Sequence, residues 1–79
     1  MLDIKIQRFG TGVGFYCRFD SNIDEIAVIN LDPQEVIIHN DVLNKIFNTK
    51  YNISSNNIDV IIQVVISFIK EHEKYFVFL

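Results

Sequence analysis

Three glycines at alternating positions are the first feature of the sequence that could do chemistry. Gly10, Gly12 and Gly14 lie in the stretch RFGTGVGFYCRF. Glycine-rich loops cradle phosphates where they run directly into the N-terminus of a helix, with the spacing GxGxxG. Here the spacing is GxGxG, and residues 15–19 form an aromatic run that favours a strand. We therefore interpret the glycines as the tight turn of a β-hairpin and not as a phosphate-binding loop.

A second candidate is a calcium loop. Asp20, Asn22 and Asp24 have the D-x-N-x-D spacing that opens an EF-hand loop. Glu25 stands where that loop needs a glycine, and Leu31 stands where it needs a bidentate glutamate. A polar turn between two strands explains the same residues, so we predict no metal site.

The single cysteine is the third candidate, as a nucleophile paired with His39 or His72. Cys17 lies between Phe15 and Phe19 on the predicted core face, where burial raises the pKa of a thiol and suppresses the reactive thiolate. Neither histidine has ligand spacing to a second histidine or cysteine. We expect no catalytic residue, no metal and no cofactor, and therefore a protein that is not an enzyme.

Composition limits the class of protein. The 79 residues are enough for one small domain, residues 1–79, and 49% of them are apolar. One cysteine forms no internal disulfide, and residues 1–9 lack the pattern of a signal peptide, so we expect a cytoplasmic location. The longest apolar run, residues 58–69, is interrupted by Gln63 and Ser67 and is too short to span a membrane.

Turn chemistry predicts the register of the first hairpin. A two-residue type II′ turn takes glycine first, which centres the turn on Gly12 and Val13. Lys5 then lies opposite Asp20, and Phe9 lies opposite Tyr16. The alternative turn, centred on Thr11 and Gly12, sets Lys5 against Arg18, which is a repulsive pair. The favoured register places one apolar set on the core face: Leu2, Ile4, Ile6, Phe15, Cys17 and Phe19.

Two further strands follow in this interpretation. In the third, residues 26–31, Ile26 and Val28 join the core face, and the alternate residues point outward. Residues 32–35 read either as a capping box that starts a helix or as a type I turn that leads into a strand. The β-branched run over residues 36–38 favours a short fourth strand, with Asn40 capping a helix over residues 41–50. In the other interpretation this helix starts eight residues earlier.

The last helix is the most strongly patterned element. Asn57 or Ser55 can cap it, and its polar residues, including Asp59 and Gln63, form so narrow a stripe that we expect packing on several sides. The final residues, KYFVFL, are expected to dock as the end of this helix, as an edge strand or on a partner. The predicted fold class is α+β: an N-terminal antiparallel β-meander of three to four strands followed by two C-terminal helices packed on the sheet.

The outward face of this sheet is the predicted partner-binding surface. Besides Ala27, it carries five candidate partner-binding residues: Phe9, Tyr16, Arg18, Ile29 and Leu31. Aromatic residues, arginine and aliphatic residues together are typical of protein interfaces. The alternative is that one helix covers each face of the sheet, in which case these residues are core.

We therefore expect a small non-enzymatic protein-interaction module, either a dimer or bound to a larger macromolecule. The isoleucine- and asparagine-rich composition is typical of an AT-rich genome and suggests an accessory or inhibitory protein of a low-GC bacterium or its phage. One alternative is a nucleic-acid-binding module, in which a lysine-bearing helix edge is joined by Tyr51 and Tyr75; the net charge of −3 argues against it. The other is a small-ligand-binding domain, which needs a pocket with convergent polar groups. No small-molecule substrate and no membrane contact are predicted.

Overall fold

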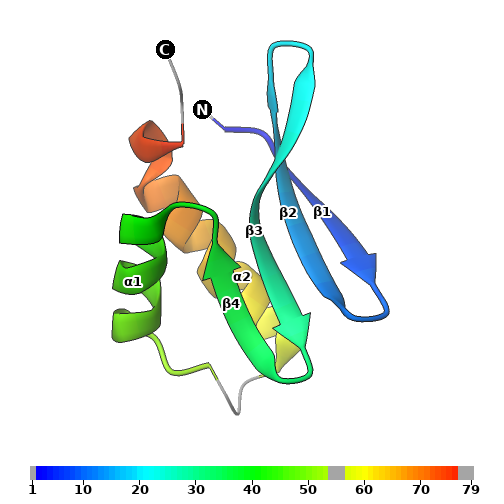
Figure 1. Ribbon diagram of the computed structural model, residues 1–79, viewed down its shortest axis with the longest axis vertical. Coiled ribbons are helices and arrows are strands. Elements are labelled where there is room, and N and C mark those ends of the chain that lie inside the picture. Colours follow the sequence, from blue (N-terminus) through cyan, green and yellow to red (C-terminus); the bar gives the residue numbers. More distant parts are fainter. Residues whose placement is uncertain (1, 54–56, 77–79) are drawn as a thin grey trace.

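The computed structural model describes residues 2–53 and 57–76 of the chain. Figure 1 shows their order, which is β1 (Ile4–Phe9), β2 (Gly12–Phe19), β3 (Asn22–Leu31), β4 (Gln34–Ile38), α1 (Asp41–Lys50), α2 (Ile58–Glu71) and the short 3-10 helix η1 (Glu73–Tyr75). The strands form one antiparallel sheet in the order β1-β2-β3-β4. The predicted α+β meander followed by two helices is therefore confirmed.

Local side-chain chemistry sets where the helices begin. The side chain of Asn40 accepts a hydrogen bond from the Leu43 amide at 3.0 Å, and that of Asn57 accepts one from the Asp59 amide at 2.8 Å. Each bond satisfies an amide that the first turn of a helix leaves without a partner. The fourth strand and the cap at Asn40 are thus confirmed, and Asn57 caps α2. Ser55, the other predicted cap, lies outside the described residues.

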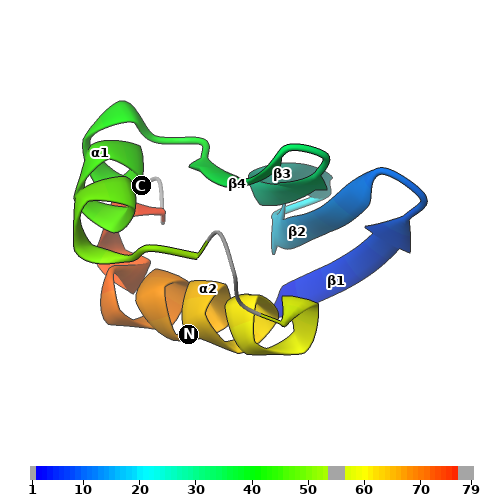
Figure 2. The ribbon, with the colours of Figure 1, turned by 90° about the horizontal axis from the view of Figure 1, so that it is seen from below.

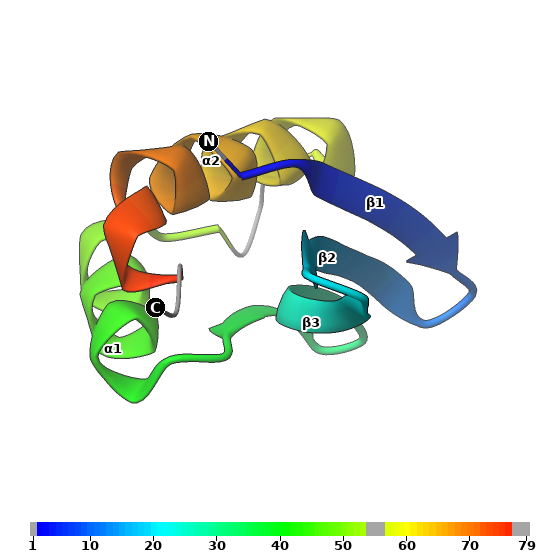
Figure 3. The ribbon, with the colours of Figure 1, turned by 90° about the horizontal axis from the view of Figure 1, so that it is seen from above.

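The two helices take different positions against the sheet. Figures 2 and 3, viewed from opposite ends, show the sheet curling so that one face looks toward α2, while α1 lies beside β4. Phe15 of the sheet, Phe47 of α1 and Phe68 of α2 are all fully buried. The rings of Phe47 and Phe68 meet edge to face with their centroids 5.1 Å apart, a favourable aromatic geometry. The core therefore lies between the inner face of the sheet and both helices.

The helix α2 is covered on one broad side only. Its buried residues are Ile61, Ile62, Val65, Phe68 and Ile69. The side chain of Val60 is 52% exposed, so the expectation of packing on several sides is too strong. Beyond η1, Phe76 is 3% exposed and belongs to the core. The rest of the apolar end, residues 77–79, lies outside the described residues.

The predicted register of the first hairpin is wrong. The turn is formed by Gly10 and Thr11, and Lys5 lies opposite Tyr16 instead of Asp20. None of the three glycines has a positive φ, so the primed turn on which the prediction rested is not formed. The partner of each β1 residue moves by four positions along β2. Because this shift is even, the predicted division of both strands into two faces survives it.

The predicted faces of the third strand are wrong beyond Ile26, which is 6% exposed and belongs to the core as predicted. Next to the turn, Tyr16 pairs with Glu25, and this register would have placed Ile26 and Val28 inward as predicted. A β-bulge between Phe15 and Tyr16 then leaves Ile26 as an extra residue, and Phe15 pairs with Ala27. One inserted residue exchanges the two faces of everything beyond it. Ala27 and Ile29 are consequently core residues with no exposed surface, whereas Val28 turns outward and is only half-buried.

A candidate interaction surface on the outer face of the sheet

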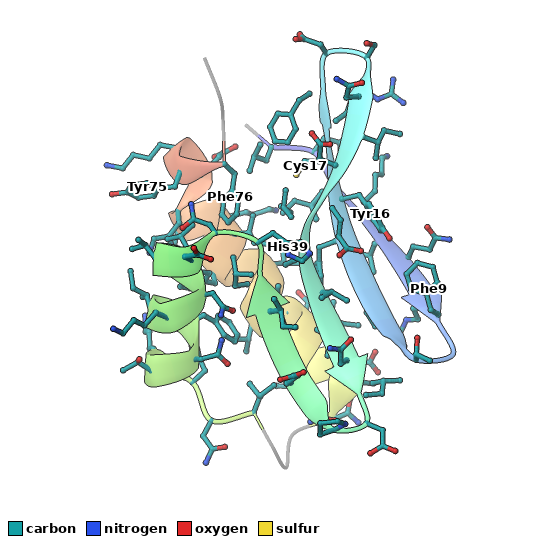
Figure 4. The ribbon with its side chains drawn as sticks, viewed as in Figure 1. Phe9, Tyr16, Cys17, His39, Tyr75 and Phe76 are labelled. Carbon is teal, nitrogen blue, oxygen red and sulfur yellow. The ribbon has the colours of Figure 1, made fainter. Side chains whose placement is uncertain are left out.

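The face of the sheet turned away from α2 is called the outer face here. Strand pairing and the alternation of side chains assign it these residues: Lys5, Gln7 and Phe9 of β1; Gly12, Gly14, Tyr16 and Arg18 of β2; Ile23, Glu25, Val28 and Asn30 of β3; and Glu35 and Ile37 of β4. Figure 4 views the molecule from this side, with Phe9, Tyr16 and His39 labelled. Neither helix lies over this face of the sheet (Figure 2).

Three of the five predicted partner-binding residues lie on the outer face. The side chain of Phe9 is 43% exposed, Tyr16 is half-buried and Arg18 is exposed. The bulge in β3 removes the other two. Ile29 has 0% exposure and is core, so its predicted outward position is wrong. Leu31 shares the core side of the strand with Ile29 but lies at the end of the sheet, where it is 38% exposed.

Sequence reasoning missed three apolar residues of the outer face. Ile23 lies opposite Arg18 and is 61% exposed. Val28 lies opposite Gly14 on one side and opposite Ile37 on the other. The side chains of Val28 and Ile37 are half-buried. Alternation within β3 could have found Ile23, because it precedes the bulge. The placement of Val28 and Ile37 depends on the bulge, which no local signal in the sequence marks.

A hydrogen-bonded group of three polar side chains lies in the middle of this face. The Glu25 carboxylate accepts a hydrogen bond from Nε2 of His39 at 2.7 Å, with the ring proton on that nitrogen, and another from the Tyr16 hydroxyl. Burial, followed by the hydrogen bond to Glu25 and its negative charge, raises the pKa of Tyr16. The phenol therefore stays protonated and acts as a donor. The group holds Tyr16 in place.

Two of the glycines in the opening motif make this arrangement possible. A Cβ at Gly14 would lie 2.7 Å from the Tyr16 hydroxyl oxygen, so the ring of Tyr16 lies directly over Gly14. A Cβ at Gly12 would lie 2.1 Å from the carbonyl oxygen of Ile29 in the neighbouring strand. Both glycines belong to β2, and the chain continues as strand up to Phe19. They serve close packing, and the helix N-terminus that a phosphate loop requires does not follow them.

The structure does not bring Cys17 together with either histidine. Cys17 is 1% exposed, and burial, with smaller contributions from the charges of Asp3 and Glu73, raises the pKa of its thiol. The His39 ring is bound to Glu25. His72 closes the end of α2, where its amide and its Nδ1 both contact the carbonyl oxygen of Phe68, at 3.1 and 2.8 Å. The predicted burial of Cys17 is confirmed.

The described surface includes two hollows whose lining is defined. One, of about 250 Å³, lies beside Cys17 and is lined by Asp3, Lys5, Arg18 and Ile23 as well. The other, of about 340 Å³, lies between α1 and η1 and is lined by Asn40, Val42, Leu43, Ile46, His72 and Tyr75. Three charged side chains, Asp3, Lys5 and Arg18, line the first hollow, whereas no acidic, lysine or arginine side chain lines the second. Within the described ranges, no three histidine, cysteine or acidic side chains are grouped as metal ligands.

The aromatic residues of the alternative nucleic-acid surface contact lysines of their own chain. Lys50 lies over the ring of Tyr51 and Lys74 over that of Tyr75, each at 5.3 Å from the centroid. Tyr51 also packs on Phe47, with the centroids 4.8 Å apart. Tyr51 is therefore a half-buried part of the core edge, and only Tyr75, at 52% exposure, offers a face for stacking.

Comparison with known proteins found no matching family model, no matching curated protein and no matching solved structure. Among the helices of residues 2–53 and 57–76, none has the length and apolar character needed to cross a lipid bilayer.

Proposed function

We propose that this domain is a non-enzymatic protein-interaction module that binds its partner through the outer face of the sheet. One observation carries the proposal: this face of the sheet exposes large apolar side chains, with Phe9 at 43% and Ile23 at 61%. The solvent face of an antiparallel sheet normally carries polar residues. Exposed apolar groups bordered by charged ones, here Lys5, Arg18 and Glu35, are typical of protein-binding surfaces.

The centre of the face suits binding for an energetic reason. Tyrosine and arginine are enriched among the residues that dominate binding energy, and Tyr16 and Arg18 lie two positions apart on β2. The Tyr16 ring is already fixed by Gly14 beneath it and by Glu25 at its hydroxyl. A side chain that is ordered before association loses little entropy on binding. Such preorganisation favours a specific partner over nonspecific apolar contact.

Within this proposal, the isoleucine- and asparagine-rich composition suits an accessory or inhibitory protein of a low-GC bacterium or its phage. The high pKa of Cys17 and its separation from both histidines support a role without catalysis.

The double variant Tyr16→Ala with Arg18→Ala tests the proposal. A partner captured from the host and then purified should bind the variant at least about tenfold more weakly, which corresponds to about 1.4 kcal/mol. The free energy of unfolding should fall by about 1–2 kcal/mol, because the hydrogen bond to Glu25 is lost, which is less than the loss for a core variant. The matched control is Ser67→Ala with Lys70→Ala, on the exposed side of α2, which should bind normally. Unchanged binding by the first variant, or unfolding as early as for a core variant, would contradict the proposal.

A further inference from the structure

The two edges of the sheet differ in how their backbone is covered. At the β4 edge, the amide of Ile38 donates to Oδ1 of Asn44 at 2.8 Å, and Nδ2 of Asn48 donates to the carbonyl of Val36 at 3.2 Å. Both asparagines belong to α1. Polar side chains of the helix thus replace the next strand, and this edge is closed to further pairing.

The β1 edge is open. Residues 5–9 are all exposed, and β1 pairs with β2 in a regular register without a bulge. Across the part of the chain that the structure describes, the backbone hydrogen bonds of β1 go to β2 alone. Because an antiparallel ladder uses alternate residues, the others turn their amides and carbonyls away from β2. A regular, uncovered strand of six residues is a template for an added strand.

Charge indicates what kind of strand fits. β1 contains Lys5 and Arg8 and no acidic residue, in a chain of net charge −3. Lys5 has Asp3 at 3.7 Å and Arg8 has Asp59 at 2.6 Å, but both pairs are more than half exposed and contribute little. The guanidinium of Arg8 uses Nη2 toward Asp59, and a guanidinium has five donors in all. Arg8 can therefore donate hydrogen bonds to a second carboxylate.

A second copy of the chain fits this edge poorly. Two copies of β1 can pair antiparallel across this edge. If their outer faces are to form one continuous surface, one residue of β1 must lie directly opposite the same residue of the other copy. Pairing centred on Lys5 or Arg8 places identical cations directly opposite each other, which is destabilising. Centred on Ile6 or Gln7, it still gathers four cations along one seam. Positive charge on an edge strand is a common device against self-association.

We propose that the β1 edge receives an extended acidic segment of the partner protein, which joins the sheet as an antiparallel fifth strand. This inference rests on the proposed function, because Phe9 belongs both to this edge and to the outer face. The first residue of the segment lies opposite Phe9 and the sixth lies opposite Ile4. In this order, its residue types are apolar, acidic, polar, apolar, acidic and apolar. Its two carboxylates meet Arg8 and Lys5, and its apolar residues meet Phe9, Ile6 and Ile4.

Two capped peptides test the inference: Val-Glu-Thr-Val-Glu-Val and its lysine counterpart, Val-Lys-Thr-Val-Lys-Val. The acidic peptide should bind the full chain about tenfold more tightly, or more, because two favourable charge pairs replace two repulsive ones. On binding, amide hydrogen exchange should slow at alternate residues of β1. The variant Lys5→Glu with Arg8→Glu should reverse the preference between the peptides. The matched control, Lys45→Glu with Lys70→Glu, has the same charge change on the helices and should keep the original preference.

Four other results of these experiments would contradict the inference. Equal binding of both peptides, no binding of the acidic peptide, or binding without protection of β1 would overturn it, as would dimerisation of the free chain through β1 in light scattering. The experiment with Tyr16→Ala and Arg18→Ala on the outer face is independent of these results. Failure of that test, with intact binding of the acidic peptide to β1, would instead overturn the proposed function and leave the edge as a separate site.

Discussion

Replacing Gly12 with alanine should cost far more stability than replacing Gly14, although both lie in β2. A Cβ at Gly12 would lie 2.1 Å from the carbonyl oxygen of Ile29 and 3.2 Å from its carbonyl carbon. These are backbone atoms of the adjacent strand, which move only if β2 and β3 separate. A Cβ at Gly14 would meet three atoms of the Tyr16 side chain at 2.7–2.9 Å. A side chain can rotate away, whereas a paired strand cannot.

The magnitudes follow from these contacts. Carbon–oxygen contacts between strands lie near 3.3 Å, so Gly12→Ala requires a separation of about 1 Å. Strain of about 1–3 kcal/mol and one weakened ladder hydrogen bond of about 1 kcal/mol lower the stability by about 2–4 kcal/mol. A domain of this length has about 4–12 kcal/mol in all. Gly14→Ala loses the hydrogen bond from Tyr16 to Glu25, about 1 kcal/mol, offset by about 0.5 kcal/mol from the lower entropy of the unfolded chain.

Urea unfolding followed by far-UV circular dichroism measures both effects. Gly14→Ala should be within about 1 kcal/mol of the parent, and in the Tyr16→Ala background it should become neutral or stabilising by about 0.5 kcal/mol. The double-mutant cycle between positions 14 and 16 should therefore give a coupling of about 1 kcal/mol. If Gly12→Ala unfolds at the same urea concentration as the parent, or if Gly14→Ala costs the same in both backgrounds, the structural explanation of the glycines is refuted.

Three further predictions concern the core and the closed edge. Cys17→Asp buries an unpaired carboxylate in the core and should abolish the cooperative thermal transition, whereas Cys17→Ala should retain it. Asn44→Ala leaves the Ile38 amide without its acceptor and should lower the unfolding free energy by about 1–3 kcal/mol, while Lys45→Ala on the same helix should stay within about 0.5 kcal/mol in the same urea titration. Burial raises the folded-state pKa of Cys17 above its ordinary value of 9.0, so the thiol of the unfolded chain loses its proton at a lower pH. The contribution of this thiol to the free energy of unfolding should therefore be full below pH 9.0 and should be lost as the pH rises through the folded-state pKa. Thermal melts between pH 7 and 10 should show this decline, and an equal decline in Cys17→Ala would contradict it.

The elements that depend on neighbouring residues could be predicted from the sequence. The β-branched run at Val36–Ile38 indicated β4, and the asparagines at positions 40 and 57 marked the starts of both helices. The burial of Cys17 between two phenylalanines followed from alternation along β2. These features need information from only a few adjacent positions, so strand propensity, capping and periodicity were sufficient.

The register of the strands could not be predicted in the same way. Turn chemistry favoured Gly12 as the turn residue, because a glycine is the usual start of a primed turn. In the structure, Gly10 and Thr11 form the turn. Position 12 requires glycine because the backbone of Ile29 lies too close for a Cβ atom. The demand for glycine comes from a strand that is distant in sequence. A rule based on local turns cannot detect it.

The sequence by itself determined the order of strands and helices, the caps, and which side of β1 and β2 faces the core, because these depend on alternation and short-range bonding. Only the tertiary structure decided the composition of the outer face. The bulge at Ile26 moves Ile29 into the core and Val28 out of it, since one extra residue reverses every side chain beyond it. The free energy gained by burying Ala27 and Ile29 must exceed the free-energy cost of the bulge. That gain exists only in the folded protein, where the sheet packs on α2.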